Sequence, residues 1–228
     1  METGRVDYTF HFIDVWRARD ELLWGAWLTV QLSAVSMVLS LAIAVLGALG
    51  RTSGPGWLRG VIAAYVEFVR NTPFLVQVFV IFFGLPALGI RLEANTGALI
   101  AMVLNGSAYT IEIVRAGIEA VSHGQVEAAR ALGLHRIQTF RSVVLPQALR
   151  AVFAPLGSQF ILLMLNSSIV SVISADELTA AAQDIQSRTF RSFEVYIVVT
   201  AIYFVLSLAF SGVFQGLNRV FFPKLEGR

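Results

Sequence analysis

The sequence has no cysteine among its 228 residues and few charged side chains, and each shortage excludes a class of protein. Without cysteine there is no disulfide framework, thiolate metal site or cysteine nucleophile. The three histidines, at positions 11, 123 and 135, lack the spacing of metal ligands, so no metal site is expected. Only 14% of residues are charged and 56% are hydrophobic, whereas soluble domains carry about 25% charged residues. A soluble globular fold is therefore excluded.

Two further absences narrow the function. The net charge of +2 provides no broad basic surface, so no nucleic-acid partner is expected. The sequence also lacks the G-x-x-x-x-G-K-S/T loop that cradles nucleotide phosphates, so we expect this chain to bind no ATP and to have no catalytic residues of its own.

Five long stretches carry no Asp, Glu, Lys or Arg, and together they make up about half of the chain. They are Leu22–Gly50, Asn71–Ile90, Ala94–Ile111, Ala151–Ala175 and Val195–Asn218. Each is near the ~20 residues that a helix needs to cross a bilayer. Because the stretches are long and rich in Leu, Ala and Val, helices fit better than the short alternating strands of a barrel. The sequence predicts an all-α polytopic membrane protein, with five transmembrane helices near residues 22–50, 60–86, 97–120, 151–174 and 194–217.

The distribution of basic residues predicts the orientation. With an external N-terminus, eleven basic residues lie on the cytoplasmic side: Arg51, Arg59, Arg70, Arg115, Arg130, Arg136, Arg141, Arg150, Arg219, Lys224 and Arg228. Six lie outside: Arg5, Arg17, Arg19, Arg91, Arg188 and Arg191. Cytoplasmic loops carry the excess of Lys and Arg. We therefore expect a periplasmic segment 1–21, one transmembrane domain 22–220 with a cytoplasmic loop 121–150, and a cytoplasmic tail 221–228.

Two segments between the predicted spans look helical. The outer one, Ser174–Glu194, predicts a short periplasmic helix and turn. The inner one predicts two short helices, Gln125–Leu132 and Arg136–Val144, separated at Gly133 and ending before Leu145-Pro146. From composition alone, this inner element could be an amphipathic loop that rests on the lipid surface.

The order of residues in the inner loop favours a more specific interpretation. Glu127-Ala128-Ala129 is followed after three residues by Gly133, and after nine more by Val143, one residue and Leu145-Pro146. This resembles the EAA loop of permease subunits of ABC importers, with Val143 in place of Ile. The small alanines allow a short helix to enter a groove on a partner, Glu127 can accept hydrogen bonds or cap the helix, and Gly133 permits a positive φ. The resemblance implies that these residues couple the chain to an ATPase.

Three membrane segments extend the resemblance to nearly the whole chain, from about residue 20 to residue 220. They are Phe68–Gln77 (FVRNTPFLVQ) followed by Phe83–Pro86 (FGLP), Ser107–Ile118 (SAYTIEIVRAGI) and Gly25–Ser33 (GAWLTVQLS). They resemble the polar amino acid permease family, of the histidine and glutamine type. The resemblance implies the five-helix fold of a type I ABC importer permease in the bacterial inner membrane. It also implies partners: ATPase subunits that bind ATP and Mg, a second permease subunit in a homodimer or heterodimer, and a periplasmic amino acid binding protein.

Amides on the fourth predicted span are candidates for the substrate path. Gln159 and Asn166 are seven residues apart and therefore share a helix face, with Ser167 beside them. Each could instead hydrogen-bond to a neighbouring helix. The resemblance implies that relatives which carry cationic amino acids have Glu and Asp at these two positions. In those relatives Lys-Asp precedes the serines, where this chain has Leu165-Asn166. Two neutral amides favour a neutral polar or acidic amino acid over a cationic one.

The second predicted span contributes further candidates, Asn71, Thr72 and Gln77. Pro73 lacks an N–H and so frees the carbonyl of Val69, four residues earlier. This segment could line the substrate path, or Pro73 could simply kink the helix for packing, and the sequence favours neither interpretation.

In the third span, Glu112 and Arg115 share a face with Glu119. Such a charge ladder is usually structural, and the alternative is a cytoplasmic gate.

Two other functions compete with the importer. An ion-driven secondary transporter should show internal repeats, broken helices and a membrane-embedded acid, and no repeat is evident. A non-transporting membrane scaffold would explain the helices but would leave the EAA loop without a purpose.

Overall fold

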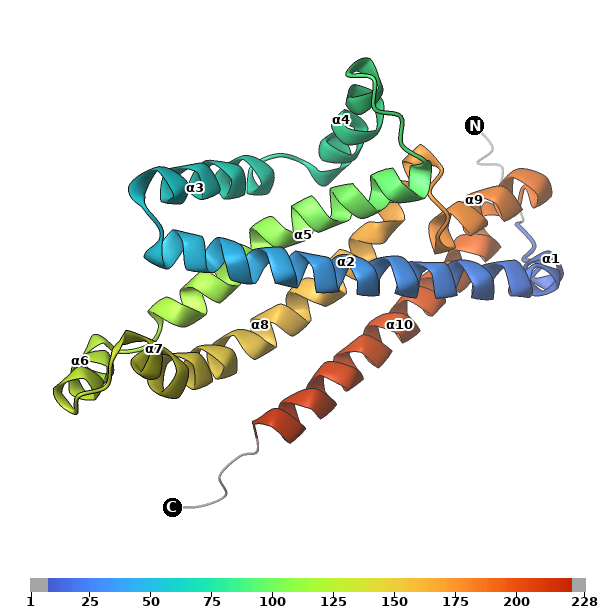
Figure 1. The fold of residues 1–228 in the computed structure, drawn as a ribbon. Coiled ribbons are helices and arrows are strands. Elements are labelled where there is room, and N and C mark those ends of the chain that lie inside the picture. The colour runs from blue at the N-terminus through green and yellow to red at the C-terminus, as the bar shows by residue number, and fades with distance from the viewer. Residues whose placement is uncertain (1–7, 223–228) are drawn as a thin grey trace, which may run out of the picture.

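The computed structural model describes residues 8–222, and every regular element in that range is helical (Figure 1). The order is α1 (Ile13–Arg17), α2 (Arg19–Ser53), α3 (Gly56–Arg70), α4 (Phe74–Ala87), α5 (Ala94–Glu119), α6 (His123–Ala131), α7 (Arg136–Thr139), a π-helical turn η1 (Phe140–Val144), α8 (Leu145–Asn166), a 3-10 helix η2 (Ser167–Ile173), α9 (Leu178–Thr189) and α10 (Ser192–Phe221). The prediction of an all-α fold is confirmed. Arg5, Lys224 and Arg228, counted for the orientation, lie outside the described residues.

Four helical segments are long and apolar enough to cross a bilayer: α2, α5, the continuous run Arg136–Ile173, and α10. They coincide with four of the five predicted spans. The predicted outer helix is also present as α9, and the predicted inner pair as α6 and α7. Long uncharged segments form helices because a membrane interior leaves backbone groups no partners except one another.

The predicted span 60–86 is wrong as one continuous helix. It consists of α3 and α4, whose axes meet at 108° across Asn71–Pro73, so that only the pair together could form one crossing. Pro73 cannot donate a backbone hydrogen bond, and it keeps Thr72 out of helical geometry. The helix before the break carries Arg59, Glu67 and Arg70, and the uncharged run begins only at Asn71. Pro73 indicated a kink in this segment, but no local pattern gave the size of the change in direction.

The predicted end of the second loop helix before Leu145-Pro146 is also wrong. The helical run passes from α7 through η1 into α8 and stays continuous from Arg136 to Ile173. Pro146 occupies the first turn of α8, where a missing N–H is tolerated. The π-helical turn directly before it adjusts the backbone to the proline.

Small residues form the centre of the bundle. Helix α2 buries a stripe of serine and alanine against α5, and these two helices form the most extensive pair. A Cβ added at Gly106 of α5 would lie 2.6 Å from the Ser40 hydroxyl oxygen, and one at Gly117 would lie 2.0 Å from a methyl of Val152 in α8. Such close approach is how helices associate in lipid, where apolar surface alone gives no driving force. Helix α10 lies outside this core and is mostly exposed.

The two ends of the bundle differ in construction. Helices α1 and α9 lie at the end where α2 begins, whereas α6, α7 and the last turn of α10 lie at the other end (Figure 1). We call these the N-side and the C-side. On the N-side, the Glu177 carboxylate caps α9 by accepting the Ala180 N–H at 2.7 Å, and it also accepts the Tyr203 hydroxyl at 2.7 Å. Burial raises the pKa of the Glu177 carboxyl above its ordinary value, against the effect of these hydrogen bonds.

Candidate functional site

A cavity of about 490 Å³ lies between the end of α3, the C-side half of α5 and the middle of α8. Its polar lining consists of Arg70, Tyr109, Glu112 and Gln159, and small or apolar residues of α5 and α8 form the remainder. Lining by a few convergent polar groups on otherwise apolar walls is typical of small-molecule sites. Of the amides predicted for the path, Gln159 is the one that lines this cavity.

Arg70 is the cation of the cavity, and the site prediction from sequence missed it. It is the last residue of α3, about 20 Å along the helix axis from Gly56 at the start of that helix, whereas the charge count placed it on the cytoplasmic side. Without it the count is ten to six, which still favours the same orientation. Its guanidinium lies 5.5 Å from the Tyr109 ring centroid and forms no ion pair within residues 8–222. Its position directly before Asn71-Thr72-Pro73 is the signal that could have identified it.

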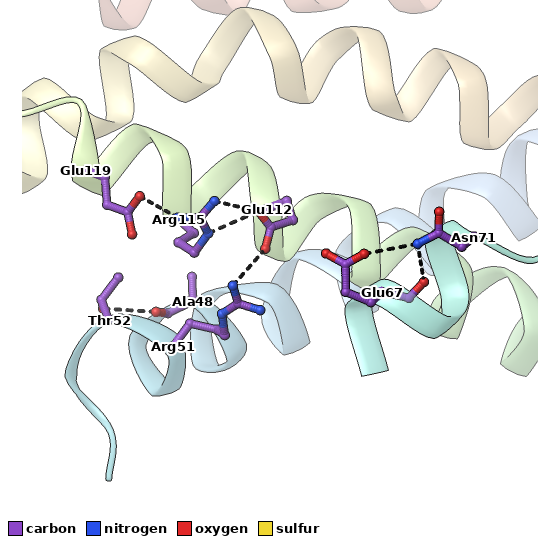
Figure 2. A network of polar contacts seen from close by, with 8 residues as sticks. All are labelled: Ala48, Arg51, Thr52, Glu67, Asn71, Glu112, Arg115 and Glu119. Atoms are coloured by element: carbon purple, nitrogen blue, oxygen red, sulfur yellow. Dashed lines mark hydrogen bonds and ion pairs between the residues drawn. The ribbon is translucent and has the colours of Figure 1, made fainter. Parts of the chain in front are cut away.

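The predicted ladder on α5 is present and extends to α2 (Figure 2). The Glu112 carboxylate lies 2.7 Å from the Arg115 guanidinium and 3.6 Å from that of Arg51, and Arg115 also pairs with Glu119. These side chains join the C-side ends of α2 and α5 at the edge of the cavity. A gate function for Glu112 and Arg115 stays a prediction.

The other predicted path residues of the fourth span are arranged differently from Gln159. Asn166 is the last residue of α8 and does not line the cavity. Ser167 is fully buried, and its hydroxyl donates to the Met164 carbonyl at 2.7 Å. Within residues 8–222, the half-buried amides of Gln159 and Asn166 make no hydrogen bond, so both are available to a ligand or to a partner subunit.

The predicted residues of the second span complete the broken end of α3. The Asn71 amide donates to the Glu67 carbonyl at 2.8 Å, the Thr72 hydroxyl to that of Phe68 at 2.9 Å, and the Gln77 amide to that of Val69 at 2.8 Å. The carbonyl expected to be freed by Pro73 is thus satisfied by Gln77. Helix ends need such partners because their last carbonyls have none within the helix. The donor groups of these three side chains are therefore already engaged.

Asn105 holds this arrangement from α5 and was not predicted. Only 4% of its surface is exposed, and its amide donates to the Gln77 side-chain oxygen at 2.9 Å. A single buried Asn in an apolar span is a signal that sequence reasoning could have used, because polar groups in the membrane need partners. The chain of contacts from Asn105 through Gln77 to Val69 fixes the break, and with it the position of Arg70.

The predicted coupling loop has the turn that its glycine implied. Gly133 has φ of +84°, and the N–H of Gly133 donates to the Arg130 carbonyl at 2.9 Å while that of Leu134 donates to the Ala129 carbonyl at 3.2 Å. These two bonds form a Schellman motif that ends α6. The expectation of a positive φ at Gly133 is confirmed.

The loop presents a compact apolar surface on the C-side. Ala129 is the buried residue of α6, whereas Ala128 and Pro146 are exposed and Leu145 is half-buried. Leu132 and Ile137 flank the turn and are 82% and 73% exposed. Glu127 is exposed and does not cap α6, because the helix begins at His123, four residues earlier. Exposed large apolar residues outside the spans mark an interaction surface.

Comparison with known proteins shows which family this fold and sequence match. The family described as the binding-protein-dependent transport system inner membrane component matches residues 37–226. The glutamine transport system permease protein GlnP of Escherichia coli K12 is 35% identical over 213 residues, covering 92% of this chain and 97% of GlnP. The probable glutamine ABC transporter permease protein GlnM of Bacillus subtilis is 42% identical over 178 residues, covering 78% of this chain and 81% of GlnM. A chain in the crystal structure of an amino acid ABC transporter with histidines has a TM-score of 0.88 and 38% identity, covering 93% of this chain and 99% of that chain. This chain therefore belongs to the family of inner membrane components of binding-protein-dependent transport systems.

Proposed function

We propose that the chain is the permease subunit of a type I ABC importer that carries a polar amino acid across the bacterial inner membrane. The observation that carries the proposal is the continuous helix from α7 through η1 to α8. It joins the exposed coupling loop directly to Gln159 in the cavity wall, so a displacement of the loop moves the cavity.

The partners follow from this role. The Glu127–Pro146 surface is proposed to dock an ATPase subunit, which supplies the ATP and Mg chemistry that this chain lacks. A second permease subunit, the same or related, would complete the path, and a periplasmic amino acid binding protein would deliver substrate to the N-side. ATPase closure then switches the cavity between outward and inward access, and the difference in substrate affinity between the two states supplies direction.

The cavity favours a neutral polar amino acid. Arg70 offers a cation for the substrate's carboxylate, and the Gln159 amide offers both a donor and an acceptor for a polar side chain. The carboxylate of Glu112 is already paired with Arg51 and Arg115 and is not free to bind a cationic side chain. Two relatives have names that mention glutamine, a substrate of this kind. Asn166 then offers a second amide beyond the cavity, on the N-side, whereas Ser167 is buried with its hydroxyl engaged.

The broken span α3–α4 is a feature that would also be expected of an ion-driven secondary transporter. The break here is capped by Asn71, Thr72 and Gln77. The two acids described near it are already engaged: the exposed Glu67 accepts a hydrogen bond from Asn71, and Glu112 pairs with Arg51 and Arg115 (Figure 2). The family match carries no support for a secondary transporter.

The test is uptake by the complete transporter in vesicles with a chosen amino acid. Loss of one direct hydrogen bond costs on the order of 1 kcal/mol, so Gln159→Ala is expected to reduce uptake about fivefold, and Arg70→Gln by more. Asn166→Ala tests the second amide. The matched control is Gln215→Ala, which removes an exposed amide from α10. The binding protein's affinity for free substrate should not change in any variant. Wild-type uptake by both Arg70→Gln and Gln159→Ala would refute the proposed path.

A further inference from the structure

A second, separate hollow lies on the C-side between the start of α8 and the end of α10. It has a volume of about 760 Å³ and is lined by Leu145, Pro146, Gln147, Leu149, Arg150, Phe153, Phe221 and Phe222. We call it the α8–α10 groove. It shares no residue with the cavity around Arg70 and Gln159.

Helix packing explains why the groove exists. Further into the membrane, α8 and α10 touch: a Cβ added at Gly157 would lie 3.2 Å from the Phe214 ring. From that contact the helices separate toward the C-side, and the aromatic rings of Phe153 and Phe222, 5.4 Å apart, form the floor between them. The groove therefore lies between this helix contact and the C-side end of α8.

Among residues 8–222, the lining of the groove includes one charged side chain, Arg150, and no acidic one. The Arg150 guanidinium lies 5.8 Å from the Phe222 ring centroid, and it forms no ion pair within residues 8–222. Helix α8 contains no acidic residue, and α10 contains none after Glu194, at its opposite end. A cation above apolar walls, with no carboxylate among the described residues that line them, favours an anion that brings its own apolar chain.

We propose that the α8–α10 groove binds one anionic phospholipid. Its phosphate lies against Arg150, and an acyl chain lies along Leu149, Phe153 and Phe222. Only 6% of the residues in the most apolar stretch of α10 are buried, so lipid has direct access to the groove along this helix. The site joins the start of α8, beside the coupling loop, to the leaflet on the C-side.

The test measures lipid retention by the complete transporter, purified with its ATPase and offered equal amounts of phosphatidylglycerol and phosphatidylcholine. Native mass spectrometry counts the lipids that remain bound. We expect the wild type to retain phosphatidylglycerol preferentially and Arg150→Gln to lower this preference about fivefold. Leu149→Trp fills the groove without changing its charge and should lower retention of both lipids. The matched control is Arg219→Gln, which removes an exposed charge on the last turn of α10, outside the groove.

Several outcomes would overturn the proposal. Equal losses in Arg150→Gln and Arg219→Gln would show general surface charge rather than a site. Absence of any preference in the wild type, or displacement of the lipid by inorganic phosphate alone, would exclude a phospholipid as the occupant. Because the chain has no native cysteine, Leu149→Cys can be cross-linked cleanly, and efficient cross-linking to the ATPase would assign the groove to that subunit.

Discussion

At the scale of single residues, amide side chains substitute for missing backbone partners inside the membrane. Gln77 donates to the carbonyls of Val69 and Thr72 and accepts from Asn105, so one side chain connects α3, α4 and α5. An unsatisfied buried polar group costs about 1–3 kcal/mol. The sequence predicted the freed carbonyl of Val69 from Pro73, but the partner eight residues later requires the 108° turn, which only the folded chain shows.

Replacing Gln77 or Asn105 by leucine should therefore destabilise the transporter. We expect each variant to lose about 1 kcal/mol of unfolding free energy, measured in detergent. The double variant should lose less than the sum, because the two side chains are coupled. Gln147→Leu is the matched control, since Gln147 is exposed and bonds only to its own helix. Additive losses would show that the contact between Gln77 and Asn105 carries no energy.

At the scale of elements, apolar length predicted where helices lie but not how they join. The spans around α2, α5 and α10 followed from uncharged runs, and Gly133 correctly predicted the turn after α6. The passage through η1 into α8 was missed because Leu145-Pro146 usually ends a helix, and a π-helical turn leaves no mark in hydrophobicity. Arg70 and Tyr109 meet only because α3 stops beside α5, a tertiary fact that no local pattern contains.

The Schellman turn makes Gly133 the most sensitive position of the coupling loop. No atom lies within 4 Å of a Cβ added there, so a substitution acts through backbone strain alone, which is about 1–2 kcal/mol at positive φ. We expect Gly133→Val to lower stimulation of ATPase activity by the loaded binding protein, and Gly133→Asn to restore part of it. Gly124→Ala, in the helix α6 that this turn ends and without positive φ, is the control. Normal stimulation of ATPase activity in Gly133→Val would show that coupling does not depend on this turn.

At the scale of the whole molecule, the four long helical segments and the bent pair α3–α4 leave the start of α2 and the end of α10 at opposite ends of the bundle (Figure 1). Helix α9 and the start of α2 lie on the N-side, and α6, α7 and the end of α10 lie on the C-side (Figure 1). Docking of a cytoplasmic ATPase on α6 and α7 requires the C-side to face the cytoplasm. The charge distribution and the proposed coupling surface, two independent arguments, therefore require the same orientation.

Single-cysteine labelling tests this orientation without a background, because the chain has no native cysteine. Phe190, at the end of α9, is 85% exposed, and Gln138, in α7, is also exposed. In intact cells with a permeable outer membrane, an impermeant maleimide should label Phe190→Cys and should not label Gln138→Cys. Disruption of the inner membrane and removal of the ATPase should make Gln138→Cys reactive, which controls for a site that is merely covered. Labelling of Gln138→Cys alone in intact cells would reverse the orientation, and the coupling surface would then face away from any cytoplasmic ATPase.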